Sequence, residues 1–88
     1  MQYTVYIILS KKIDKYYVGY SEDIYVGLKQ HNEGFSTYTS RANDWQIKYS
    51  EAFESRELAM KREKEIKNKK SRKYIEYLIS SSERFRDG

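Results

Sequence analysis

The sequence has no cysteine and a single histidine, His31, among its 88 residues. These absences exclude disulfide bonds and every structural zinc site that needs four Cys or His ligands. The fold must therefore rest on packing alone. Because a chain of this length buries only roughly 60–65% of the surface exposed by its unfolded form, it has room for one domain with a small core.

Long hydrophobic runs are missing as well. No stretch approaches the roughly 18 apolar residues that a membrane-spanning helix needs. The start Met1-Gln2-Tyr3 lacks the basic segment followed by an apolar core that is typical of a secretory signal. We therefore expect a soluble cytoplasmic protein with no membrane partner.

Acidic residues are scarce in one segment, residues 61–73. The formal net charge of the chain is +4, but this segment holds eight Lys or Arg and two Glu, which gives it +6 and leaves −2 elsewhere. A polyanion responds to such local charge, although an ordinary solvated surface is the alternative interpretation. The candidate nucleic-acid contacts are Lys61, Arg62, Lys64, Lys67, Lys69, Lys70, Arg72 and Lys73, with Arg41 as a further candidate in a loop.

Three segments are rich in β-branched and aromatic residues. Residues 3–9 and 16–20 flank a polar stretch and predict an antiparallel hairpin, and the alternation over residues 45–53 predicts a third strand, with Glu51 as its one mismatch. Gly19 is unexpected inside a strand, where glycine often marks the close approach of another backbone or a ligand, with a bulge as the plain interpretation.

Three helices are predicted from caps and apolar spacing. Asp23 caps the first, which Gly34 ends; Ser55 caps the second, which runs to about Lys69; Ser71 caps the third. The order strand, strand, helix, strand, helix, helix predicts an α+β fold in which helices cover a three-stranded antiparallel sheet. We expect one domain over residues 1–80 and a disordered tail over 81–88.

Two positions on the first helix suggest a site. Gly27 and His31 lie one turn apart on the same side. Glycine in a helix interior costs about 1 kcal/mol relative to alanine, so either a neighbour approaches Gly27 closely or a longer side chain has been lost there. His31 taken alone is more typical of an interface or a helix cap than of a catalyst.

Glu63 is the candidate metal ligand of the second helix. It follows Ala59 by four residues and precedes Ile66 by three, so it borders the apolar stripe. A carboxylate there must be paired, hydrogen-bonded or bound to a cation. A salt bridge to Arg62 or Lys67, or simple exposure to solvent, is the plain interpretation, whereas Mg²⁺ with several waters and substrate phosphates is the functional one.

The two strand motifs resemble those that name the GIY-YIG nuclease superfamily. Thr4-Val5-Tyr6 corresponds to the first motif and Tyr17-Val18-Gly19 to the second, with ten residues between them. The small stand-alone bacterial members are also similar in Leu28-Lys29-Gln30-His31-Asn32, in a Tyr38-Thr39 loop that ends at Trp45, and in the segment from Ala59 to Lys67. The resemblance covers about residues 3–79.

The resemblance implies a metal-dependent DNA endonuclease of structure-selective or repair type. It assigns Tyr17, and with it Tyr6, to activation of the attacking water, His31 to assistance of that base, and Glu63 to Mg²⁺ or Mn²⁺. The family's arginine, which stabilises the reacting phosphate, falls on Gly27. Arg41 and Arg62 are the other possible sources of a guanidinium group.

An absent arginine predicts a very slow nuclease or none, since such arginines contribute on the order of 10³–10⁵ in rate in other phosphoryl-transfer enzymes. The alternatives are a domain that binds DNA or RNA without cleaving it and a small protein-interaction domain. A protein partner that directs the domain to its target would suit any of these functions.

Overall fold

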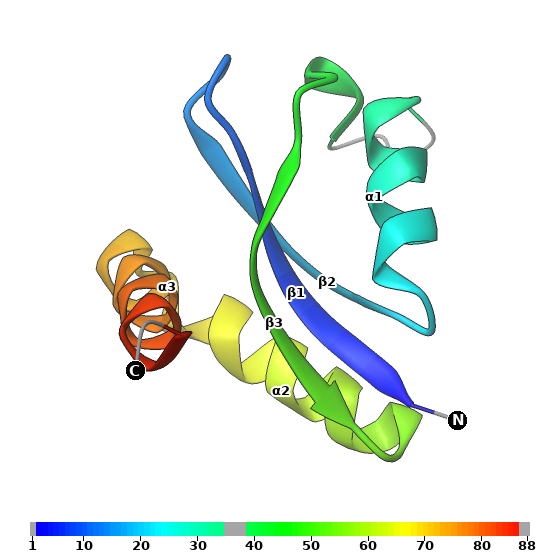
Figure 1. Cartoon of the computed structure of the whole chain (residues 1–88), viewed down its shortest axis with the longest axis vertical. Coiled ribbons are helices and arrows are strands. Elements are labelled where there is room, and N and C mark those ends of the chain that lie inside the picture. The colour runs from blue at the N-terminus through cyan, green and yellow to red at the C-terminus, as the bar shows by residue number, and fades with distance from the viewer. Residues whose placement is uncertain (1, 35–38, 87–88) are drawn as a thin grey trace.

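The computed structural model describes residues 2–34 and 39–86 and contains three strands and three α-helices in these ranges (Figure 1). Their order confirms the predicted β-β-α-β-α-α arrangement of an α+β fold. A short 3₁₀ helix, η1, adds one turn in the loop before the third strand. The bounds are β1 Tyr3–Ser10, β2 Lys15–Ser21, α1 Ile24–Asn32, η1 Thr39–Arg41, β3 Gln46–Phe53, α2 Arg56–Lys69 and α3 Arg72–Arg86.

The sheet has the strand order β2-β1-β3 and is antiparallel throughout. Tyr6 lies opposite Gly19, and Ile8 lies opposite Tyr17, so Tyr6 and Tyr17 are diagonal neighbours on one face. The pairing of β1 with β2 is regular through Gly19, which removes the bulge interpretation of this glycine. The register shift lies instead between β1 and β3, at Ile7 and Ile8.

Each face of the sheet covers its own apolar cluster, because successive residues of β1 point to opposite faces. Val5 and Ile7 pack with Ala59 and Ile66 of α2 and with α3. Tyr6 and Ile8 pack on the other face with Ala42, Trp45 and partly buried side chains of α1. In Figure 1, accordingly, α1 lies on one side of the sheet and α3 on the other.

The helix ends follow the predicted capping residues. The Asp23 carboxylate accepts hydrogen bonds from the backbone N–H groups of Tyr25 and Val26, and Gly34 has a φ of 84° just beyond α1. Ser55 accepts a hydrogen bond from the Leu58 N–H at the start of α2. These caps place Gly27 and His31 on the buried side of α1, as the spacing predicts.

Helix α3 extends past the predicted end of the domain. Its buried or half-buried residues include the predicted stripe of Tyr74, Ile75, Leu78 and Ile79, but the helix continues to Arg86 instead of ending near residue 80. No glycine or proline interrupts residues 80–86, so nothing local stops it. Among the described residues, none of the helices is long and apolar enough to cross a bilayer.

Candidate active site

Tyr6 and His31 form the centre of a polar cluster on the α1 face of the sheet. The Tyr6 hydroxyl oxygen lies 2.8 Å from His31 Nε2 in a buried hydrogen bond. The side chains come from β1 and α1, and Tyr6 is only 4% exposed. Strand alternation and the caps of α1 together therefore bring two residues separated by 25 positions into direct contact.

Tyr17 completes the aromatic part of the cluster. Its ring centroid lies 4.9 Å from that of His31 at an interplanar angle of 57°. Gly19 lies beneath both tyrosines, since a Cβ atom added there would be 2.8 Å from the Tyr6 hydroxyl oxygen and 3.1 Å from a ring carbon of Tyr17. The absence of a side chain at Gly19 is thus what lets the tyrosines meet above the strand.

His31 is held from its other side by the η1 segment. Its Nδ1 lies 2.7 Å from the Thr39 hydroxyl, and the Thr39 carbonyl accepts a hydrogen bond from the Trp45 indole N–H at 2.9 Å. Asn32 also pairs with the backbone of Trp45 in both directions. The residues of the loop that lie within 35–38, including Tyr38, fall outside the described part of the chain.

Burial shifts both groups of the Tyr6–His31 pair toward their neutral forms. It raises the pKa of the Tyr6 hydroxyl, and the nearby Tyr17 and Glu63 raise it further. Burial also lowers the pKa of His31 below its usual value of 6.5. At neutral pH the imidazole is therefore uncharged and has one nitrogen free to accept a proton.

This shift predicts a measurable loss of stability in acid. Because the unfolded chain binds a proton at His31 more readily than the folded one, stability should be full above about pH 6.5 and fall as the pH drops below it. A ¹H NMR titration is unambiguous because His31 is the one histidine in the sequence. We expect a pKa below 6.5, whereas a value at or above 6.5 would show that the ring is not desolvated.

Glu63 lies close enough to this cluster to raise the pKa of Tyr6. It forms a salt bridge with Lys67, 3.3 Å from Oε1 to Nζ, and its side chain is 20% exposed. The Lys67 ammonium also lies 5.4 Å from the centroid of the Tyr17 ring. The predicted salt bridge is thus present, and it ties Glu63 to the tyrosine site.

The donor set at Glu63 suits a hard cation that keeps most of its water. Within residues 2–34 and 39–86 no group of three or more His, Cys, Asp or Glu side chains is arranged to hold a metal. A single carboxylate that is close enough to Tyr6 to affect its pKa nevertheless fits Mg²⁺, which takes its remaining ligands from water and phosphate. Lys67 already demonstrates that a positive charge fits against Glu63.

Gly27 faces the same cluster from α1, and a Cβ atom fits at this position. A Cβ atom added there would lie 3.5 Å from the Tyr6 hydroxyl oxygen and 3.6 Å from Ser21, which are ordinary contact distances. Of the two explanations predicted for this helix glycine, close packing is therefore not required. A longer side chain at this position would start from α1 toward the Tyr6 hydroxyl.

The candidate nucleic-acid contacts lie on different surfaces. Lys67, Lys70 and Arg72 line a groove beside Tyr17, whereas Lys61, Lys64 and Lys69 line another surface of α2. Arg41 and Lys73 are exposed, and Arg41 lines a depression beside the end of α1. The basic segment is therefore not one continuous surface.

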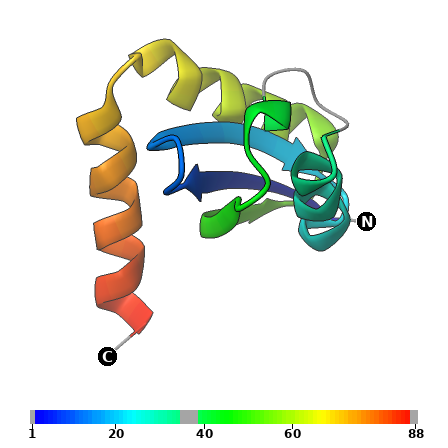
Figure 2. The same cartoon turned by 90° about the horizontal axis from the view of Figure 1, so that it is seen from above.

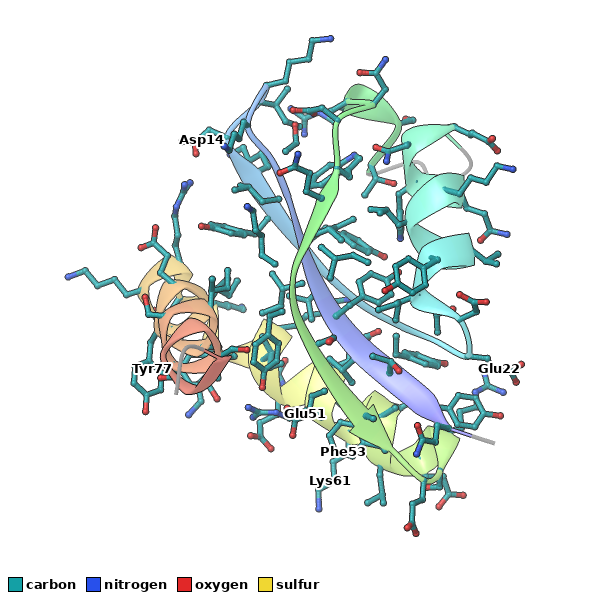
Figure 3. The ribbon with its side chains drawn as sticks, in the orientation of Figure 1. Asp14, Glu22, Glu51, Phe53, Lys61 and Tyr77 are labelled. Atoms are coloured by element: carbon teal, nitrogen blue, oxygen red, sulfur yellow. The ribbon has the colours of Figure 1, made fainter. Side chains whose placement is uncertain are left out.

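Arg62 is engaged inside the fold and does not face Tyr6. Its guanidinium donates to Glu51 and to the Tyr74 hydroxyl, each at 3.1 Å, and also pairs with Glu65. Glu51 is shown between β3 and α2 in Figure 3. Glu51 is the one mismatch in the strand alternation. Its contacts account for its position, because the carboxylate accepts hydrogen bonds from both Arg62 and Tyr49.

Sequence reasoning gave no role to Thr39, although it is fully buried and hydrogen-bonded to His31. Its segment has no periodicity that could have indicated the contact. Lys67, by contrast, was predicted as a possible salt-bridge partner of Glu63, which it follows by one helical turn.

Comparison with known proteins agrees with this arrangement. The family model described as the GIY-YIG catalytic domain matches residues 2–75. The structure is similar to the solution NMR structure of the UPF0213 protein BH0048 from Bacillus halodurans, at 34% identity and a TM-score of 0.57, over 91% of this chain and 84% of that one. No curated protein matches the chain. The strand motifs, the fold and the family match together show that this chain belongs to the GIY-YIG family.

Proposed function

We propose that this protein is a metal-dependent DNA endonuclease with a very low turnover. The observation that carries the proposal is the buried hydrogen bond between Tyr6 and His31, with Tyr17 and Glu63 beside it. A nuclease-like fold follows from the family, but the activity does not. The low turnover follows from Gly27, which stands where the family's arginine is expected.

His31 is suited to take up a proton during attack on a phosphodiester. In the tautomer with the proton on Nδ1, Nδ1–H donates to the Thr39 hydroxyl and Nε2 accepts from Tyr6. Tyr6 can then accept a proton from the attacking water while it passes its own hydroxyl proton to His31 Nε2. The lowered pKa of His31 keeps its nitrogen free for this purpose at neutral pH.

Glu63 would hold Mg²⁺ or Mn²⁺, which supplies positive charge for the phosphate and lowers the pKa of bound water. Lys67 balances the Glu63 charge in the structure described here. A lysine released from that salt bridge becomes available to a phosphate oxygen. This would replace the charge of an arginine, but not its two parallel hydrogen bonds.

A domain that binds nucleic acid without cleaving it is the second candidate, and Gly27 is the residue that favours it. RNA remains an alternative ligand under that function, and a protein partner could direct either activity to its target. The cytoplasmic location and the details of the substrate stay predictions.

Nicking of supercoiled plasmid tests the proposal. At high protein concentration with Mg²⁺ or Mn²⁺ we expect slow conversion to open circles. We expect Tyr17→Phe to lower the rate at least about 100-fold, the smaller end of the contribution typical of acid–base groups, and Glu63→Gln to lower it at least as much, because it removes the carboxylate proposed to hold the metal. Tyr77→Phe is the matched control, since Tyr77 is 63% exposed on α3. An intact plasmid would exclude catalysis, and equal nicking by all variants would identify a contaminant.

A further inference from the structure

A cationic groove adjoins the candidate active site along the free edge of the sheet. It has a volume of about 580 Å³ and lies between β2, the end of α2 and the start of α3. Figure 2 shows the corner between these two helices next to the hairpin end of β1 and β2. Four of its ten lining residues are cationic and none is acidic: Lys15, Lys67, Lys70 and Arg72.

The groove and the active site share two residues, Tyr17 and Lys67. Lys67 pairs with Glu63 at one end of the groove. A strand whose reacting phosphate lies near Tyr17 and Glu63 would therefore meet the groove cations with its neighbouring phosphates. A groove lined by several cations attracts a phosphodiester backbone.

Two of the cations are held in place and two are uncommitted. Arg72 bonds to the carboxylate and the carbonyl of Asp14 and stacks on the Tyr16 ring, 5.0 Å from its centroid. Lys67 is held by Glu63. Lys15 and Lys70, by contrast, form no ion pair with any residue in the described ranges.

Lys70 is also in an unfavourable backbone conformation. It ends α2 with φ 48° and ψ 38°, in the left-handed region that glycine adopts at no steric cost. A lysine here carries a conformational cost with no ion pair in the described part of the fold to offset it. The left-handed conformation is a common way to end a helix, and here it places a lysine in the lining of the groove where a glycine would be less strained.

We propose that this groove binds the DNA strand on one side of the cleaved phosphate, through Lys15, Lys67, Lys70 and Arg72. The proposal rests on the proposed nuclease function and extends it by assigning the path of the substrate. It also excludes the other basic surface of α2, where Lys61 points away from the sheet in Figure 3. If the groove binds DNA and the other surface does not, substitutions of equal charge on the two surfaces should change DNA affinity by different amounts.

The test compares two double variants by fluorescence anisotropy with a labelled single-stranded DNA oligonucleotide. Lys15→Glu with Lys70→Glu should weaken binding about tenfold or more at low salt and flatten the dependence of log K on log salt by about 1.4, or about 0.7 for each lost phosphate contact. Lys61→Glu with Lys64→Glu has the same net charge and should change affinity by less than about threefold, because only non-specific attraction is altered. Equal losses of affinity in the two double variants, or no binding of the oligonucleotide by the parent protein, would contradict the proposed role of the groove.

Lys70→Gly supplies a second readout that unfolding cannot imitate. It should raise the melting temperature, because glycine relieves the left-handed conformation, and yet weaken DNA binding about threefold. A higher melting temperature with unchanged affinity would contradict the assignment. Plasmid nicking separates the two proposals. If the variant Lys15→Glu with Lys70→Glu nicks plasmid at the parent rate, the proposed DNA path through the groove is wrong and the nuclease function stands. If DNA binding depends on the groove but the parent protein does not nick plasmid, the nuclease function is wrong and the groove stands.

Discussion

Replacing Gly27 with arginine is expected to raise the rate of plasmid nicking by on the order of 10³-fold, the lower end of the contribution of comparable arginines. The side chain would leave α1 toward the Tyr6 hydroxyl, and its Cβ would lie 3.5 Å from that oxygen, an ordinary contact distance, so the first atom of the side chain fits without a shift of the helix. A guanidinium group there can form two hydrogen bonds to a phosphate. Rates of nicking under single-turnover conditions measure the effect.

Val26→Arg is the matched control for this substitution. It adds the same charge one residue earlier, at a position that is 51% exposed. If the added charge only increases attraction to DNA, both variants should nick faster. If the arginine acts on the reacting phosphate, only Gly27→Arg should nick faster.

Replacing Trp45 with alanine is expected to lower the free energy of unfolding by about 3–5 kcal/mol. Trp45 is 2% exposed and packs between the sheet and η1, where its indole N–H binds the Thr39 carbonyl. Such a loss approaches the whole stability of a small domain. Denaturant unfolding measures this loss. The NMR titration of His31 should also approach that of an exposed histidine, because Thr39 is released from the ring.

Trp45→Phe separates the two contributions of this side chain. It keeps much of the apolar ring but removes the donor to the Thr39 carbonyl, so we expect a smaller loss, about 1–3 kcal/mol. If Trp45→Ala cost less than about 1 kcal/mol, the η1 segment would not be anchored as described and His31 would need another support.

Local sequence signals predicted the parts of the site that depend on periodicity. The composition of the strands predicted the β1–β2 hairpin, and the caps at Asp23 and Gly34 oriented His31, whereas Tyr6 and Tyr17 were identified only by the resemblance to the GIY-YIG motifs. The contact of Thr39 with His31 had no such signal, since it depends on a loop without a period.

Charge counted along the chain was a poorer guide to the proposed binding surface. Residues 61–73 cover more than one side of α2, so a window of sequence merges residues that the helix separates. Arg62 lies in that window but is bound by Glu51, a partner fixed by the packing of β3 against α2. Lys15 lies outside it, and joins Lys70 only because the hairpin meets the α2–α3 corner.

The most direct test of the active-site assignment is the nicking rate of Gly27→Arg with Glu63→Gln, compared with that of Gly27→Arg alone. If the arginine acts on a phosphate held at this site, the double variant should fall to the background rate, because both changes act on one reacting group. Equal nicking by the double and the single variant would show that the arginine acts elsewhere, and would contradict the assignment of Tyr6, Tyr17, His31 and Glu63 as a nuclease site.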